Sequence, residues 1–164
     1  MNVYTPYTAP KPPKNSRLIY LGGTPASTEF DWREEFISRL ETPLGREYCL
    51  GTPYSDVHER DAETEITANT RFVDLSTAAG VCVFWFTEKV PDDIGFSSEL
   101  SDLEIACLLV GRASSTKKRC ERLIIGAEGG AVTPIMQHLF LTMGIPVYEN
   151  LIDVSIGANQ VLAH

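Results

Sequence analysis

The clearest hydrophobic segment of the chain is the unbroken run VCVFWF at residues 81–86. Such a run, rich in β-branched and aromatic side chains, is typical of a strand that is buried on both faces, as in a parallel sheet. Beyond a polar turn, Leu100, Leu103, Cys107 and Val110 recur with the spacing of one helix face. The centre of the chain therefore predicts a buried strand that leads into a helix.

Similar patterns on either side of this unit predict the other elements. Strands are expected at residues 17–21, 48–50, 121–126 and 145–148, and helices near residues 30–40, 63–79, 134–143 and 150–162. Strands and helices thus alternate along the chain, which is the order of a parallel sheet made of β-α-β units. We expect an α/β fold with a five-stranded parallel sheet and helices on both faces, a flavodoxin-like or Rossmann-like three-layer sandwich.

The first 16 residues differ from the rest of the chain. They include four prolines and show no hydrophobic period. Such a segment is expected to be a flexible, proline-rich arm, or to lie extended across a neighbour with Tyr4 and Tyr7 as anchors. Residues 17–164 have the length of a single domain.

Composition and charge narrow the classes of partner. The chain has 14 Lys and Arg against 22 Asp and Glu, a net charge of −8. An acidic surface argues against binding to duplex nucleic acid, because phosphate contacts need clustered basic side chains. No apolar run approaches the length that spans a membrane, so no membrane partner is expected.

The four cysteines are far apart and lack the spacing of zinc ligands or of a disulfide framework. We therefore expect no metal and no cofactor, and reduced thiols in a cytoplasmic protein.

Two carboxylates, Asp93 and Glu99, lie where the central strand leads into its helix. In open α/β sheets, ligand sites gather at the carboxyl ends of the strands. If Ser97 or Ser98 caps the helix, Glu99 lies in the first turn, where the helix dipole favours an ionised carboxylate. If the capping box at residues 101–104 starts the helix, Glu99 lies on the loop. Acidic residues also stabilise helix N-termini, so position alone leaves a structural role open.

Two further features lie near the predicted strand ends. Gly22 and Gly23 follow the first strand, and paired glycines permit a close backbone approach to a ligand or a sharp turn. Neither G-x-G-x-x-G nor a P-loop is present. Asp74 lies late in the helix before the central strand, and it is either a solvated carboxylate or a group that faces the site.

Two stretches resemble the nucleoside 2-deoxyribosyltransferase superfamily. Residues 19–23, IYLGG, are similar to the opening strand I-Y-[LF]-A-G of that family, and residues 93–99, DIGFSSE, are similar to its D-x-G-T-x-x-E motif. The aromatic strand at residues 84–86 and the helix start DWR at residues 31–33 resemble the deoxyribosyltransferase-like subgroup. The order of strands and helices agrees from about residue 17 to residue 148.

The resemblance implies cleavage or exchange of the N-glycosidic bond of (deoxy)nucleosides or nucleotides. It implies that Glu99 is the nucleophile, that Asp93 protonates the leaving base and that Tyr20 holds the Glu99 carboxylate. This chemistry suits a pair of carboxyl groups, because one can stabilise or capture an oxocarbenium-like sugar while the other delivers a proton.

The resemblance also implies the residues that contact the substrate. Gly22 and Gly23 would border the sugar, and Asp74 would lie near the base. Apart from the resemblance, recognition of a phosphate would need backbone N–H groups or cationic side chains at the Gly22-Gly23 loop or near Ser97 and Ser98. Both loops lack lysine and arginine, which favours a nucleoside over a nucleotide. The family habit of completing sites across subunits implies a homo-oligomer.

Three positions depart from the family pattern. Phe96 replaces a threonine, Ser101 stands where the family tends to have glycine, and Gly22 stands where it has alanine. The alternative is therefore a catalytically inactive module of the same fold that binds a nucleotide-like ligand. A flavodoxin-like or Rossmann-like cofactor domain is a third reading, against which the missing glycine fingerprint counts.

Overall fold

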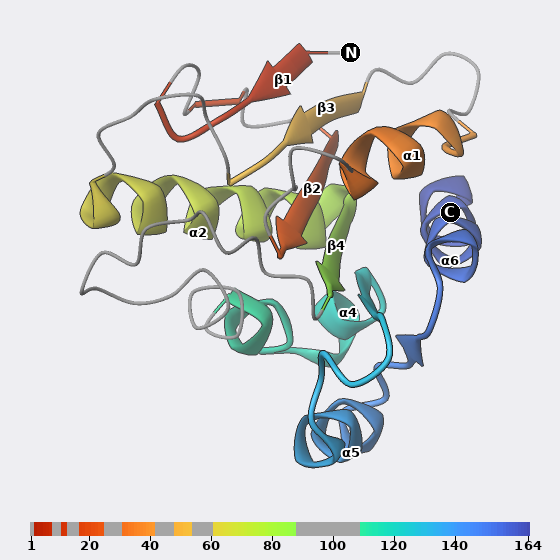
Figure 1. Cartoon of the computed structure of the whole chain (residues 1–164). Helices are drawn as coiled ribbons and strands as arrows, with labels where there is room; N and C mark the ends of the chain where they lie inside the picture. The colour runs from red at the N-terminus through yellow and green to blue at the C-terminus, as the bar shows by residue number, and fades with distance from the viewer. Residues whose placement is uncertain are drawn as a thin grey trace.

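A computed structural model of the chain describes residues 2–7, 11–12, 17–24, 31–41, 48–53, 61–87 and 109–164 (Figure 1). In chain order the elements are β1 (Asn2–Tyr4), β2 (Arg17–Gly23), α1 (Trp32–Ser38), β3 (Tyr48–Gly51), α2 (Ala62–Ala79), β4 (Val81–Phe86), α4 (Lys117–Cys120), β5 (Leu123–Ala127), α5 (Pro134–Thr142), β6 (Val147–Tyr148) and α6 (Leu151–Ala163). Residues 109–113 are also helical. The segment that leads to β5 therefore contains two short helical stretches.

The described strands form one parallel sheet in the order β1-β3-β2-β4-β5-β6. This confirms the predicted α/β class with a parallel sheet, a Rossmann-like fold, but the predicted number of five strands is wrong. The sixth strand is β1, in which Asn2, Val3 and Tyr4 pair with residues 49–51 of β3. A strand of three residues is too short to show a hydrophobic period. Its partner is also 47 residues away along the chain, so no local pattern reveals the pairing.

Successive strand residues point to opposite faces of the sheet, and both faces are buried in hydrophobic clusters. In β4 all six residues are buried, which confirms the predicted central strand. Cys82, Phe84 and Phe86 belong to a core cluster that includes residues of α2 and α5, whereas Val81, Val83 and Trp85 belong to a cluster with α1 and α6. Figure 1 shows α1 and α6 side by side.

Helix α2 is positioned by its two ends. Its N-cap is Asp61, whose side chain accepts hydrogen bonds from the backbone N–H groups of Glu63 and Thr64. At its C-terminus, a Cβ on Gly80 would lie 1.9 Å from the carbonyl oxygen of Leu18, so the chain can pass close to β2 and enter β4 at once. The C-terminus of α2 therefore lies at the amino end of β2, and its N-terminal half lies toward the carboxyl ends of the strands, since Phe72 is at the level of Gly51 and Tyr20.

Candidate functional site

The strand order reverses between β2 and β4. The chain continues from β2 to β3 on one side and returns to place β4 on the other side of β2. In open α/β sheets this reversal is the topological switch point, where ligands bind outside the carboxyl ends of the two strands. The register pairs Gly23 with Trp85 near those ends, so the candidate site lies beyond Gly23 and Phe86.

Thr24 ties the ends of β2 and β4 together. Its backbone N–H donates to the carbonyl oxygen of Trp85 at 2.8 Å, and its hydroxyl oxygen accepts from the backbone N–H of Thr87 at 3.0 Å. Because Thr24 is itself buried, these bonds are shielded from water. The two strand ends therefore form one rigid edge of the candidate site.

The start of α1 holds this edge from the other side. The indole N–H of Trp32 and a guanidinium N–H of Arg33 both donate to the carbonyl oxygen of Thr24, at 3.1 and 3.2 Å. Arg33 also donates to the carbonyl oxygen of Leu21, and its guanidinium lies 4.5 Å from the centre of the Trp32 ring. Arg33 is thus a cation at this edge that the sequence pattern did not single out, and its hydrogen bonds to Leu21 and Thr24 are to backbone carbonyl oxygens.

Packing within the protein explains both glycines at the end of β2. A Cβ on Gly22 would lie 2.6 Å from Phe84 Cε1 and 2.7 Å from Tyr20 Cε1. Gly23 has φ +108°, and its Cβ would lie 2.1 Å from the carbonyl oxygen of Trp85. The close approach predicted for this pair thus occurs between parts of the protein, and contact of Gly22 and Gly23 with a ligand stays a prediction.

Tyr20 is fully buried on the face of the sheet that α2 covers. Its ring centre lies 6.1 Å from that of Phe72 in α2 and 5.8 Å from that of Phe84 in β4. Aromatic contacts on two sides fix the ring. Tyr20 is therefore a rigid group on the strand that ends at the switch point, next to the position of Gly22.

Two polar residues on the inner face of α2 were not anticipated. Glu65 and Asn69 are 4% and 2% exposed, and with Phe72 they form a stripe at intervals of four and three residues. Tyr7 from the N-terminal arm donates to the Glu65 carboxylate at 3.1 Å. The sequence did contain a signal for these buried polar groups, because its helical spacing puts an acid and an amide on the same stripe as a phenylalanine.

Glu128 is a further carboxylate at this edge, and the sequence pattern did not single it out. It follows β5, its backbone N–H donates to the carbonyl oxygen of Phe86 at 2.8 Å, and its carboxylate accepts from the hydroxyl of Thr87 at 2.8 Å. A hollow of about 390 Å³ lies nearby, lined by Ala127, Gly129, Gly130, Gln137, Leu141, Val147 and Glu149. Of the predicted site residues in the described part of the chain, namely Tyr20, Gly22, Gly23 and Asp74, none lines this hollow.

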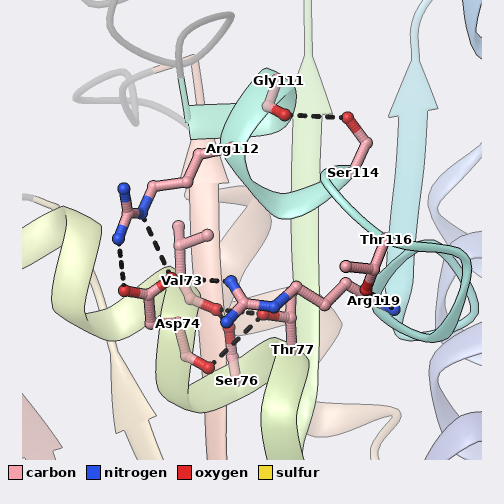
Figure 2. Close-up of polar contacts among 9 residues, drawn as sticks. All are labelled: Val73, Asp74, Ser76, Thr77, Gly111, Arg112, Ser114, Thr116 and Arg119. Carbon is pink, nitrogen blue, oxygen red and sulfur yellow. Dashed lines mark hydrogen bonds and ion pairs between the residues drawn. The ribbon is translucent and has the colours of Figure 1, made fainter.

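Asp74 lies in a different group of charges, drawn in Figure 2. Arg112 Nη2 and Arg119 Nη1 each lie 2.7 Å from an oxygen of its carboxylate. Burial alone would raise the pKa of Asp74, but the hydrogen bonds and positive charges of the two arginines outweigh burial and hold that pKa below its usual value. Asp74 belongs to the C-terminal half of α2, toward the amino ends of the strands. The structure thus places it with two arginines and not with Tyr20, Gly22 and Gly23.

The remaining predicted residues, Asp93, Ser97, Ser98 and Glu99, lie outside the described residues. Within the described ranges, no group of three or more His, Cys, Asp or Glu side chains is arranged to hold a metal ion. No helix in those ranges has both the length and the apolar character needed to cross a membrane. Cys49, Cys82 and Cys120 are free thiols, and burial raises the pKa of Cys82 to about 12.

Comparison with known proteins adds no relative to this picture. The chain matches no model of a known protein family, and it matches no curated protein sequence. The function of the protein is therefore inferred from its residues and from their arrangement.

Proposed function

We propose that the protein cleaves or exchanges the N-glycosidic bond of (deoxy)nucleosides or nucleotides, with Glu99 as the nucleophile. One observation carries this proposal: the strand order puts the topological switch point between β2 and β4. One family-like stretch, residues 19–23, is part of β2, and the other, residues 93–99, follows β4 in the chain. The first stretch is therefore part of one of the two strands whose carboxyl ends meet where this fold binds ligands, and the second stretch comes after the other strand in the sequence.

The proposed reaction has two displacement steps at the anomeric carbon. A Glu99 carboxylate oxygen bonds to that carbon while the bond to the base nitrogen breaks, and Asp93 gives its proton to the departing nitrogen. Water or a second base then bonds to the anomeric carbon while the bond to Glu99 breaks, and Asp93 recovers its proton from the attacking water or base. Tyr20 is suited to orient Glu99, because packing against Phe72 and Phe84 fixes its ring.

The substrate is proposed to be a small nucleoside rather than a nucleotide. A phosphate would need a cation, and Arg33 is a cation close to the end of β2. Its hydrogen bonds to the carbonyl oxygens of Leu21 and Thr24 engage it within the protein, which favours a substrate without a phosphate. Gly22 and Gly23 are proposed to border the sugar, and Ser97 and Ser98 to lie at its far side. A base contact from Asp74 also remains a prediction.

Three further expectations accompany this proposal. Helices α2 and α5 would form one layer against the sheet and helices α1 and α6 the other, as in a three-layer sandwich. The protein would act in the cytoplasm. It would do so as a homo-oligomer, which light scattering coupled to size-exclusion chromatography would test.

A panel of ribonucleosides, deoxyribonucleosides and their monophosphates, scored for released base, tests the reaction. We expect base release from at least one deoxynucleoside, and we expect Glu99→Ala to lower its rate by at least about a thousandfold, because the nucleophile is lost. Adding a second free base separates transfer from hydrolysis through the appearance of a new nucleoside.

The matched control is Glu121→Ala, which removes an exposed carboxylate that precedes β5 at the opposite edge of the sheet. This variant should retain the parent rate. Unchanged base release in Glu99→Ala, with the fold intact by circular dichroism, would reject Glu99 as the nucleophile.

The second candidate is a binding module of the same fold without chemistry. Phe96 and Ser101, which replace the residues expected in the family motif, favour it. Tight nucleoside binding by calorimetry, with no base released over a long incubation, would support this candidate over the enzyme.

A further inference from the structure

Asn69 has a buried carboxamide that contacts within the protein do not explain. The residue is 2% exposed, and its Oδ1 is buried without a hydrogen-bond partner in the described part of the chain. A buried acceptor that lacks a donor destabilises the folded protein, so native structures contain few of them. The donor for Asn69 Oδ1 is therefore not one of the described side chains, which leaves a water molecule or a ligand as its source.

Other buried polar groups on the inner face of α2 differ from Asn69. The hydroxyls of Ser76 and Thr77 both donate to the carbonyl oxygen of Val73, at 3.1 and 2.7 Å. Glu65 accepts the hydrogen bond from Tyr7. These three side chains thus each have a hydrogen-bond partner within the protein, whereas the Asn69 carboxamide oxygen has none in the described part of the chain.

The position of Asn69 relates it to the candidate site. The last residue of β3, Gly51, pairs with Tyr20, and a Cβ on Gly51 would lie 3.4 Å from Phe72 Cγ and 3.5 Å from Tyr20 Cδ2. Phe72 therefore lies at the level where β3 ends. Asn69 is nearly one turn closer to the N-terminus of α2, about 5 Å farther toward the carboxyl ends of the strands. That position is beside the end of β2, on the same side of the sheet as Tyr20.

We propose that Asn69 determines specificity by accepting a hydrogen bond from a sugar hydroxyl of the nucleoside. This inference rests on the proposed function, in which Tyr20 holds the nucleophile beneath the sugar. Because Asn69 is next to the phenylalanine that packs on Tyr20, the sugar is the part of the ligand nearest to its carboxamide. A neutral acceptor also suits a neutral hydroxyl donor.

The test measures binding without turnover in the full-length Glu99→Ala protein. Calorimetry gives the affinities of a 2′-deoxynucleoside and of the matching 2′,3′-dideoxynucleoside, which lacks the 3′-hydroxyl. We expect the parent to prefer the deoxynucleoside by about tenfold, the value of one net hydrogen bond. In Asn69→Leu this preference should fall to about one, through weaker binding of the deoxynucleoside alone.

The matched control is Ser76→Ala, which removes a buried hydroxyl from the same face of α2 at the other end of the sheet, and the tenfold preference should persist there. The melting temperature of Asn69→Leu should equal or exceed that of the parent, since the variant removes an unsatisfied acceptor. A purely structural role for Asn69 would instead lower the melting temperature and leave the preference unchanged.

Several outcomes would overturn the inference. Equal affinities in the parent would do so with Asn69 intact, and so would a preference that survives in Asn69→Leu. A change of preference between amino and oxo bases alone would assign Asn69 to the base and overturn its assignment to the sugar. Base release by the unmutated protein with an unchanged sugar preference rejects only this inference, whereas neither release nor binding of any nucleoside rejects the proposed function as well.

Discussion

At the scale of single residues, Gly23 is the position where the backbone leaves least choice. Its φ of +108° lies in a region that L side chains rarely adopt, and a Cβ there would meet the carbonyl oxygen of Trp85. The adjacent bond from the Thr24 N–H to that same oxygen ties β2 to β4. Any side chain at Gly23 would therefore disturb the edge on which the candidate site is built.

We expect Gly23→Ala to lower the free energy of unfolding by at least about 2 kcal/mol, from backbone strain and the clash with Trp85. Gly129→Ala is the matched control, because a Cβ on Gly129 would meet open space, and it should stay within about 0.5 kcal/mol of the parent. Urea unfolding followed by tryptophan fluorescence measures both. Equal stabilities of the two variants would contradict the steric argument.

At the scale of elements, Asp74 joins three helical segments that are separate in the sequence. It lies in α2, Arg112 lies in the helical residues 109–113, and Arg119 lies in α4 (Figure 2). The pKa of Asp74 is depressed in the folded protein. The stabilising contribution of Asp74 is therefore fully present above its unfolded pKa of about 4, and it is lost as the pH falls through the folded pKa.

We expect Asp74→Asn to lower the free energy of unfolding at pH 7 by about 0.5–1 kcal/mol, the range of partly exposed ion pairs. The difference from the parent should shrink below pH 4, as the parent carboxylate is protonated, and it should also shrink in high salt. Urea unfolding at pH 7 and pH 3 provides the measurement, with Glu149→Gln, an exposed carboxylate, as the control. A loss of the same size at both pH values would show that Asp74 acts through packing and not through its charge.

At the scale of the whole molecule, the N-terminal arm is part of the domain. Strand β1 covers the edge of β3, and the Tyr7 hydroxyl accepts from the backbone N–H of Asp61 at 2.6 Å while it contacts Glu65. The carbonyl oxygen of Pro12 accepts from Arg71 in α2. The arm thus connects the sheet edge to the N-terminus of the helix that borders the candidate site.

We expect Tyr7→Phe to lower the free energy of unfolding by about 1–2 kcal/mol, since it leaves the Asp61 N–H and the Glu65 carboxylate without this hydroxyl. Removing residues 1–12 should lower the melting temperature further, because it also exposes the edge of β3. The control is Val3→Thr, an exposed position on the same arm, which should change stability by less than about 0.5 kcal/mol. Unchanged melting after removal of the arm would contradict its role in the domain.

Local periodicity was enough to predict the fold class and the central strand. Burial of residues 81–86 and the helical spacing along α2 each depend on neighbours within a few positions, so the linear pattern contains them. The position of a site at the ends of β2 and β4 followed from the order of elements together with the general rule for open sheets. The carboxylates proposed to act there, Asp93 and Glu99, remain predictions because they lie outside the described residues.

Contacts between distant parts of the chain could be found only in three dimensions. The pairing of β1 with β3, the arginines around Asp74 and the role of Tyr7 join residues that are 38 to 58 positions apart, and periodicity contains no information on such pairs. The hydrophobic pattern therefore decides which segments are strands and helices and which faces they bury. Folding decides which polar groups meet at the edges, because charge pairing and hydrogen bonding depend on distance in space and not on distance along the chain.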